Sequence, residues 1–309
     1  MFRLQHTGRL LMRSRVQGVA GAAGIAIALA IVSDLYAGSV RARVFSLLML
    51  VSGLAPIIAP VLGSQLLAFT SWRGIFVTLA LIGVVLLLAV TLGLGETLPV
   101  ARRQSGGLAA SLCAFRDLLL DRRFLGYAFA SGFAFAAGIV YISVSPFILQ
   151  NIYGVSPQGV GILFGINALG LVIMAQVGGT LVGRMSSQAL LAGGVTAIAI
   201  GATALLVVVL SGVGLAGILP ALFVVIASLG LIAPNATTLA LSNTRSAGSA
   251  AALLGVLQLT IGAIAAPMVG LAGVATAVPM AAAIAAFGIA ALLTFIVSCR
   301  PAPSIAQGA

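Results

Sequence analysis

The sequence contains no lysine and very few ionisable side chains of any kind. Among its 309 residues are 4 acidic residues and 1 histidine, and charged residues make up 6% of the chain, against roughly 25% in soluble globular domains. This scarcity excludes a soluble enzyme, a disordered chain and a nucleic-acid-binding protein. The net charge of +11 comes from 15 arginines scattered between apolar blocks, a pattern that indicates orientation in a membrane.

Side chains that hold metals or form disulfides are nearly missing as well. Cys113 and Cys299 are the only cysteines, they lie far apart, and His6 is the only histidine, so we expect no metal site and no cofactor. Asp117 and Asp121 lie four residues apart in an arginine-rich stretch, which predicts helical ion pairing rather than a metal site. The sequence contains no phosphate-binding loop, zinc-binding helix or nucleophile elbow, so we do not expect an enzyme.

What the sequence does contain is long apolar stretches: 61% of its residues are hydrophobic. A membrane-spanning helix needs about 20 apolar residues, and this criterion predicts an all-α membrane protein with nine transmembrane helices. The predicted spans are 11–34, 44–69, 74–94, 124–149, 159–183, 188–211, 215–241, 249–272 and 277–298.

The polar stretch 95–123 separates three predicted spans from six. We therefore expect residues 1–94 to be three spans of an N-terminal half-bundle, 95–123 to be a cytoplasmic loop between the halves, 124–300 to be a six-span C-terminal half-bundle, and 301–309 to be a cytoplasmic tail. With spans alternating in direction, ten of the 15 arginines fall on one side of the membrane. The positive-inside rule makes that side cytoplasmic, which places the C-terminus inside and the N-terminus outside.

A faint internal repeat agrees with this count. The segment GLAPIIAPVLG at 53–63 aligns with TIGAIAAPMVG at 260–270, which puts the second predicted span in register with the eighth; chance similarity between helices rich in small residues is the alternative. Parallel six-span repeats explain the alignment if three spans precede this sequence. We then expect about 90 in-frame codons upstream of Met1, at about 20 residues per span plus loops, whereas a stop codon there would indicate a remnant.

Polar residues open the first predicted span. Arg15 and Gln17 precede Gly18 and Gly21, small residues that let another helix approach closely. A guanidinium at this depth is costly unless it faces a polar cavity or a partner, so Arg15 and Gln17 are candidates for a proton relay or a polar cavity. A terminal arginine that snorkels to the membrane surface is the alternative.

The second predicted span carries a stripe of helix-bending residues. Gly53, Pro56, Pro60 and Gly63 are spaced by 3, 4 and 3 residues, so all four share one helical face. Proline bends a helix and glycine permits close contact, which suits a hinge at an interface between two moving halves. Ordinary packing of a kinked helix is the alternative.

Two charged residues between the first two spans form a candidate gate. Asp34 ends the first predicted span, and Arg41 follows seven residues later on the side predicted to be cytoplasmic. The pair suits a cytoplasmic gate, although a plain surface ion pair, worth about 0–1 kcal/mol, is the alternative.

Aromatic residues concentrate in the fourth predicted span. Eight of the 19 aromatic residues fall between Phe124 and Tyr153, and such a helix suits a cavity for flat, lipophilic or cationic compounds. Contact with lipid or the core is the alternative for the aromatic residues, and hydrogen bonding between helices is the alternative for uncharged polar residues in other spans. The predicted cavity residues are Phe129, Phe133, Tyr141, Asn167, Asn235 and Gln258.

Several of these segments together resemble a known family. The sequence is similar to the major facilitator superfamily, and specifically to the Bcr/CflA group of drug-resistance efflux proteins. The segments that carry the resemblance are RVQGVAGAAG (15–24), SDLYAGSVRARVFSLLMLVSGLAPIIAPVLGSQL (33–66), SWRGIF (71–76), GETLP (95–99), FASGFAFAAGIVYISVSPFI (129–148), PNATTLAL (234–241) and AGSAAALLGVLQLTIGAIAAP (247–267).

The resemblance implies a transporter of twelve spans in two halves that works by alternating access, three of whose spans this sequence lacks. It assigns Arg15 to proton relay or the cavity, Asp34 and Arg41 to the cytoplasmic gate, and the proline and glycine stripe to the hinge. We therefore expect a monomeric, multi-pass protein of the bacterial inner membrane that drives efflux of lipophilic or cationic drugs with protons. Export of one metabolite, amino acid or siderophore is the alternative, and so is a non-transporting remnant.

The first prediction concerns Arg15. In a protein with its full set of spans, we expect Arg15→Ala to abolish drug resistance while membrane insertion stays intact, because the relay loses its cation. Growth in the presence of drug, together with the amount of protein in isolated membranes, measures both quantities. Unchanged resistance in the variant would remove the relay role.

Overall fold

The computed structural model describes residues 58–93, 108–182, 184–242, 247–271 and 276–298, and the regular structure in these ranges is helical. Apart from the helices, these residues form one isolated bridge, between Val182 and Met185. The helices are Ile58–Phe69, α3 (Trp72–Gly93), α4 (Leu108–Leu120), α5 (Arg122–Asn151), α6 (Pro157–Leu181), α7 (Ser187–Ser211), α8 (Leu215–Ser242), α9 (Ala247–Leu271) and α10 (Val278–Ser298).

Seven helices in the described ranges, α3 and α5 to α10, are long and apolar enough to cross a membrane. Each begins and ends within two residues of a predicted span. The predicted count of nine is not confirmed: span 11–34 lies outside the described residues, and of span 44–69 only the helix Ile58–Phe69 lies within them.

The described helices fall into two compact units, one containing α3 and the other containing Ile58–Phe69 and α4 to α10. Taken by itself, α3 has no buried residue. At its start the Arg73 guanidinium lies 4.5 Å from the centre of the Trp72 ring, and the Phe76 ring meets Trp72 edge-on. An aromatic residue and a cation at the end of an apolar helix are typical of a membrane–water interface.

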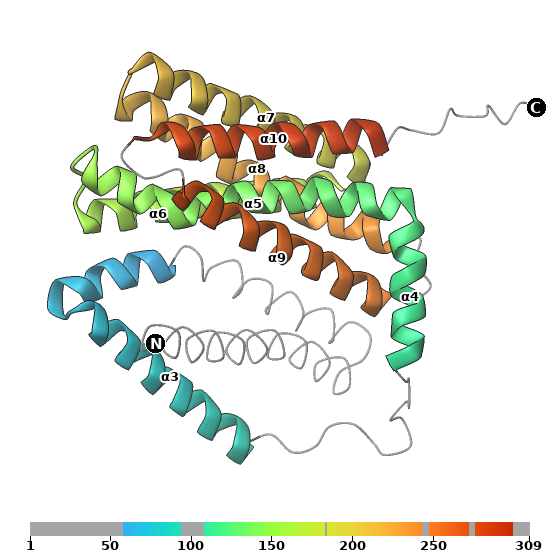
Figure 1. Ribbon diagram of the computed structural model, residues 1–309. Coiled ribbons are helices and arrows are strands. Elements are labelled where there is room, and N and C mark those ends of the chain that lie inside the picture. Colours follow the sequence, from blue (N-terminus) through green and yellow to red (C-terminus); the bar gives the residue numbers. More distant parts are fainter. Residues whose placement is uncertain (1–57, 94–107, 183, 243–246, 272–275, 299–309) are drawn as a thin grey trace, which may run out of the picture. The chain divides into compact units, whose positions relative to one another are not determined.

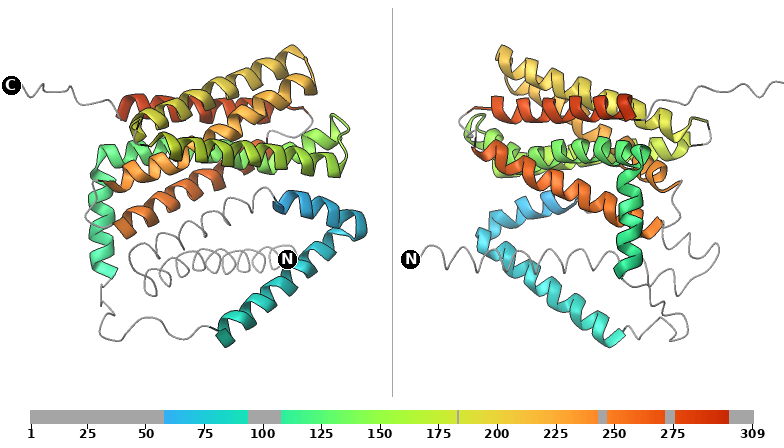
Figure 2. Two further views of the ribbon diagram at one scale, coloured as in Figure 1. Left: turned by 180° about the vertical axis from the view of Figure 1, so that it is seen from behind. Right: turned by 45° about the vertical axis from the view of Figure 1, so that its right-hand side comes forward.

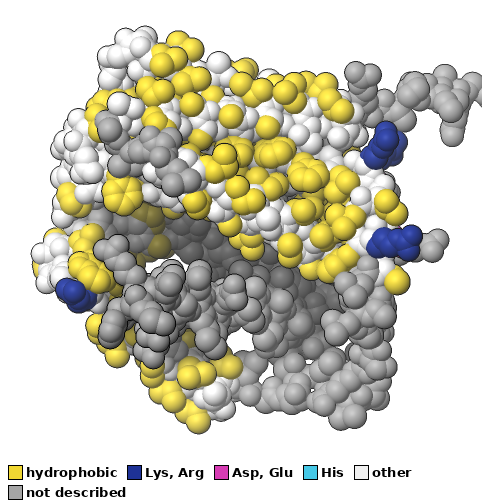
Figure 3. Space-filling model, viewed as in Figure 1, with side chains coloured by type: hydrophobic (Ala, Val, Ile, Leu, Met, Phe, Trp, Pro, Cys, Tyr) yellow, Lys and Arg dark blue, Asp and Glu magenta, His cyan; other side chains and the backbone are white. Residues whose placement is uncertain are grey.

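In the second unit α5 is the central helix. It packs against α8, α9 and α10, while α7 packs against α8 and α10, and α6 packs against α8 (Figure 1). The two further views again show α7 and α10 side by side (Figure 2). Hydrophobic side chains cover the described helices on the face shown in Figure 3, and the visible Arg side chains lie at its margins. This surface suits a surrounding of lipid.

The ends of these helices follow capping rules that the sequence contains. Asp121, Ser156 and Ser186 are the N-caps of α5, α6 and α7, and each side chain accepts a hydrogen bond from a backbone N–H of the first turn. The left-handed Gly212, with φ of 70°, ends α7. Because Asp121 caps α5, its role differs from the ion pairing that its spacing from Asp117 predicted.

The segment 95–123, predicted as the loop between the two halves, contains regular structure. It contains α4 at Leu108–Leu120, which lies across the ends of α5 and α9 and contacts both (Figure 1). Apolar residues recur there at helical spacing, and Leu118 is buried. The charged residues at both ends of this segment favoured the prediction of a loop, although its middle forms a short helix with an apolar face.

Glycine allows the helices of the second unit to approach closely. A Cβ added at Gly230 of α8 would collide with the carbonyl oxygen of Leu171 in α6 and lie 2.8 Å from the Ala175 nitrogen. A Cβ at Gly194 of α7 would lie 2.8 Å from the Ile232 side chain of α8. Lipid provides no hydrophobic driving force between helices, so such close backbone contact is what holds a membrane bundle together.

We therefore expect Gly230→Ala to destabilise the protein by about 1–3 kcal/mol, the usual cost of overpacking. Gly255→Ala in α9 is the matched control, because a Cβ there has nothing within 4 Å. Thermal unfolding of the purified protein in detergent measures both variants. Equal midpoints for the two would contradict a structural role for the contact between α6 and α8.

Candidate small-molecule cavity

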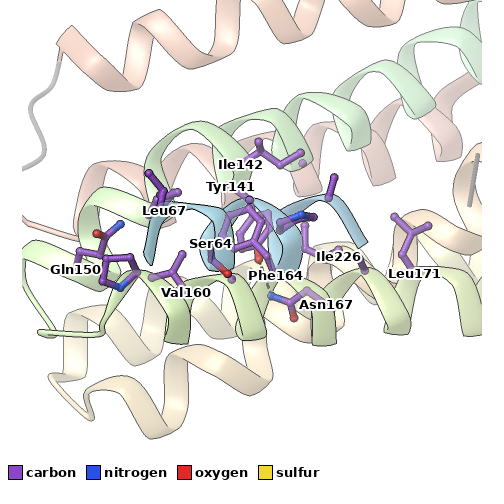
Figure 4. Close-up of a pocket in the computed structure, with 18 of the residues that line it drawn as sticks. Ser64, Leu67, Tyr141, Ile142, Gln150, Val160, Phe164, Asn167, Leu171 and Ile226 are labelled. Atoms are coloured by element: carbon purple, nitrogen blue, oxygen red, sulfur yellow. Dashed lines mark hydrogen bonds between the residues drawn. The ribbon is translucent and has the colours of Figure 1, made fainter. Parts of the chain in front are cut away.

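A cavity of about 560 Å³ lies within the second unit, between the helix Ile58–Phe69, α5, α6 and α8 (Figure 4). Small-molecule sites commonly occupy about 300–1,000 Å³. Most of the lining is apolar, and no side chain in the described part of the lining is charged. The polar side chains in the lining are Ser64, Tyr141, Gln150 and Asn167.

A hydrogen-bonded pair lies at the centre of this cavity. Asn167 Nδ2 donates to the Tyr141 hydroxyl oxygen at 2.7 Å, and the Tyr141 ring stacks on Phe164 with 4.7 Å between ring centres. Tyr141 and Asn167 are 3% and 6% exposed, so their bond satisfies polar groups whose burial would otherwise be costly. Figure 4 shows the three side chains meeting between α5 and α6.

The pair lies deep along both helices. Tyr141 is ten residues before the end of α5 at Asn151, and Asn167 is ten residues after the start of α6 at Pro157. Ten residues of helix span about 15 Å, which is half of the hydrocarbon thickness of about 30 Å. Residues 152–156 join the two helices through Gly154, whose φ of 65° favours glycine. This short connection brings Tyr141 and Asn167 to the same depth.

The helix Ile58–Phe69 closes one side of the cavity. Its Ser64 is 7% exposed and donates its hydroxyl proton to the Val61 carbonyl at 2.9 Å. A Cβ added at Gly161 of α6 would lie 2.6 Å from the Ser64 Cβ and 3.1 Å from the Pro60 carbonyl oxygen. This helix therefore rests on α6 where α6 has no side chain.

Four of the predicted site residues come together in the lining of this cavity: Pro60, Gly63, Tyr141 and Asn167. Gly63 was predicted to permit close helix contact, but a Cβ added there has nothing within 4 Å. In this structure Ser64, one residue later, makes the close contact.

The other predicted cavity residues lie elsewhere. Phe129 stacks on Phe133, and Phe133 stacks on Phe287 of α10, with ring centres 6.1 Å and 6.3 Å apart. Asn235 donates to the Leu231 carbonyl at 2.8 Å within α8, and Gln258 donates to the Ser131 hydroxyl at 3.1 Å. The lining includes none of these residues. Their cavity role stays a prediction, as do the roles of six residues outside the described ranges: Arg15, Gln17, Asp34, Arg41, Gly53 and Pro56.

Sequence reasoning missed Ser64, Gly161 and Phe164. The spacing Gly161-x-x-x-Gly165 was the available signal, since it marks a helix face open to close contact. Both glycines are buried in α6. No comparable pattern identified Phe164, because a single aromatic residue in an apolar helix usually faces lipid or core.

This geometry favours binding over catalysis. An apolar cavity with an amide and a hydroxyl at its centre can hold a small compound through surface burial and a few directed hydrogen bonds. Within the described ranges, no group of three or more His, Cys, Asp or Glu side chains could hold a metal ion. Apolar helices of membrane-spanning length around a cavity at mid-depth define an integral membrane protein of the transporter class.

Comparison with known proteins identifies the family. Residues 4–267 match the model of the Major Facilitator Superfamily. The chain belongs to this superfamily of membrane transporters. It is 38% identical over 270 residues to an uncharacterised MFS-type transporter, YdgK of Bacillus subtilis, with 86% of this chain and 67% of the relative covered.

Two further relatives carry names that refer to drug resistance. The chain is 28% identical over 271 residues to a bicyclomycin resistance protein homolog of Haemophilus influenzae, with 86% of this chain and 67% of the relative covered. It is 29% identical over 152 residues to the multidrug resistance protein MdtL of Escherichia coli O157:H7, with 49% of this chain and 38% of that protein covered.

A solved structure supports the same fold. It is a bacterial homolog of the human lysosomal transporter Spinster, in an inward-facing and unoccupied conformation. The TM-score is 0.57 at 16% sequence identity, and the match covers 88% of this chain and 72% of the other.

The contact between Ser64 and Gly161 generates a second stability prediction. We expect Gly161→Ala to lower the unfolding midpoint in detergent, because its Cβ would meet the Ser64 side chain. The double variant Gly161→Ala with Ser64→Gly should recover much of the loss, because Ser64→Gly removes the atoms in conflict. Gly179→Ala on the same helix is the control, with nothing within 4 Å of its Cβ. If the losses in unfolding midpoint of the two single variants add up in the double variant, Ser64 does not contact Gly161.

Proposed function

We propose that the protein is a proton-driven efflux transporter of the Bcr/CflA group that exports drug-like, amphipathic compounds across the bacterial inner membrane. The observation that carries the proposal is the cavity of about 560 Å³ whose described lining is apolar and uncharged, located at mid-depth in a member of a transporter family. Burial of a lipophilic compound in such a cavity is favourable at roughly 25 cal/mol per Å² of apolar surface removed from water.

The names of the relatives support the drug substrate. A bicyclomycin resistance protein homolog and the multidrug resistance protein MdtL are both similar to this chain. We propose that Arg15 and Gln17 serve the proton relay, that Asp34 and Arg41 form the cytoplasmic gate, and that the C-terminus is cytoplasmic. We also propose that protons drive the transport and that the protein works as a monomer.

Pro60 is the hinge residue whose surroundings are described. It lies in the helix Ile58–Phe69, lines the cavity, and has its carbonyl oxygen facing Gly161. Proline leaves one backbone carbonyl without its helical partner and bends the helix. The cavity wall therefore contains a helix-bending residue where it rests on α6, and we propose that the helix bends there as the cavity opens and closes during alternating access.

The direct test of this function is drug accumulation in bacteria that lack their own efflux pumps. We expect cells that make the protein to accumulate less of several unrelated lipophilic compounds than control cells, and we expect a protonophore to abolish the difference. Reduced accumulation of a single compound would favour the alternative exporter of one metabolite. Equal accumulation at normal protein abundance in the membrane would contradict the proposal.

A second expectation concerns Pro60→Ala. Alanine restores the backbone N–H that proline lacks and removes the ring that favours bending, so we expect the initial efflux rate to fall several-fold while the amount of protein in the membrane changes little. Efflux of a preloaded compound and immunoblotting of the same membranes measure the two quantities. An equal fall in rate and abundance would make Pro60 a structural residue only.

A further inference from the structure

The Tyr141 hydroxyl has a hydrogen-bond donor that no described residue accepts. A tyrosine hydroxyl donates one proton and also accepts, and here it accepts from Asn167 Nδ2 at 2.7 Å. Among the described residues, no further hydrogen bond is found for Tyr141. Its proton is therefore left for a molecule in the cavity that the residue lines.

Two other polar side chains in the lining, Ser64 and Gln150, are less suited to this task. Ser64 donates its hydroxyl proton to the Val61 carbonyl. Gln150 is nine residues beyond Tyr141 on α5, which is about 14 Å along the helix. Tyr141 is thus the hydroxyl donor at the cavity centre, and the bond from Asn167 strengthens it, because chained hydrogen bonds polarise one another.

The electrostatics of the lining work against charged ligands. Among the described residues that line the cavity, none carries a carboxylate or a guanidinium. A permanent cation that entered would lose hydration without gaining a counter-ion, which is costly in an apolar surrounding. A neutral acceptor such as a carbonyl loses less hydration on entering, and it accepts a hydrogen bond from the Tyr141 hydroxyl. The stacked rings of Tyr141 and Phe164 add flat apolar surface beside that proton.

From this arrangement we infer that the cavity selects uncharged aromatic compounds that carry a carbonyl group. The carbonyl oxygen accepts a hydrogen bond from the Tyr141 hydroxyl. This inference rests on the proposed function, since it names the substrate class of the same site. It narrows that class from lipophilic or cationic compounds to neutral carbonyl compounds. Tyr141 is the residue that distinguishes them.

Three compounds with one two-ring skeleton test the inference. N-phenylbenzamide carries the carbonyl, N-benzylaniline has CH₂ in its place, and benzyldimethylphenylammonium carries a permanent positive charge. Calorimetric titration of the purified protein in detergent, corrected with empty micelles, measures the three affinities. We expect the wild type to bind N-phenylbenzamide roughly fivefold more tightly than N-benzylaniline, the equivalent of one neutral hydrogen bond, and the cation most weakly.

Variants then assign the preference to one hydroxyl. Tyr141→Phe keeps the ring and should bind N-phenylbenzamide and N-benzylaniline equally, with the affinity for N-benzylaniline unchanged. Tyr153→Phe is the matched control, because Tyr153 packs against the core outside the cavity lining, and it should keep the preference. If Tyr141→Phe does not fold, the order of the wild type's affinities for the three compounds still tests the inferred substrate class.

The inference is overturned if the wild type binds no compound, binds the three equally or binds the cation most tightly, or if Tyr141→Phe keeps the preference. Its failure is separable from failure of the proposed function. If cells export the compounds but the purified protein does not show this order of affinities, only the substrate class is contradicted. If the protein shows the expected order but cells export nothing, the transport function is contradicted and the binding site is supported.

Discussion

The close backbone contact between α6 and α8 is the constraint on which the described part of the second unit depends. Lipid surrounds membrane helices with groups as apolar as their own, so burial of leucine or valine gives little net attraction between them. Gly230 solves this by letting α8 meet the α6 backbone at Leu171 and Ala175. The resulting dispersion contacts are individually small and collectively large. The position of α6, and with it Asn167, follows from this contact.

The cavity arises from the same small residues. Gly138, Gly161 and Ala168 line it, so space remains between helices that are otherwise tightly packed. Tyr141 and Phe164 supply the large side chains at its centre. The amide of Asn167 would be costly in an apolar surrounding, and the Tyr141 hydroxyl offsets that cost by accepting its proton. One hydrogen bond thus makes a polar recognition point possible in the middle of an apolar wall.

Polar residues in the described helices divide into two groups by their hydrogen bonds. Asn235 donates to its own helix, and Gln258 donates across to Ser131 of α5. These bonds are between protein groups and agree with the structural alternative that was open for both residues. Tyr141 and Asn167 also bond to each other, but they do so in the wall of a cavity. Location, rather than residue type, separates the polar residues of the cavity wall from those that only join helices.

The sequence by itself determined the membrane class, the positions of seven apolar helices and the resemblance to a transporter family, because hydropathy and short motifs are local properties of the chain. Four residues of the cavity lining, including Tyr141 and Asn167, were also singled out this way, since polar residues, proline and glycine stand out in apolar helices. Only the tertiary structure decided that Phe129 and Phe133 stack in the bundle while Phe164 lines the cavity. An apolar helix carries no strong polar face to indicate its rotation, so the contacts of Gly161 and Gly230 with neighbouring helices set which side chains meet.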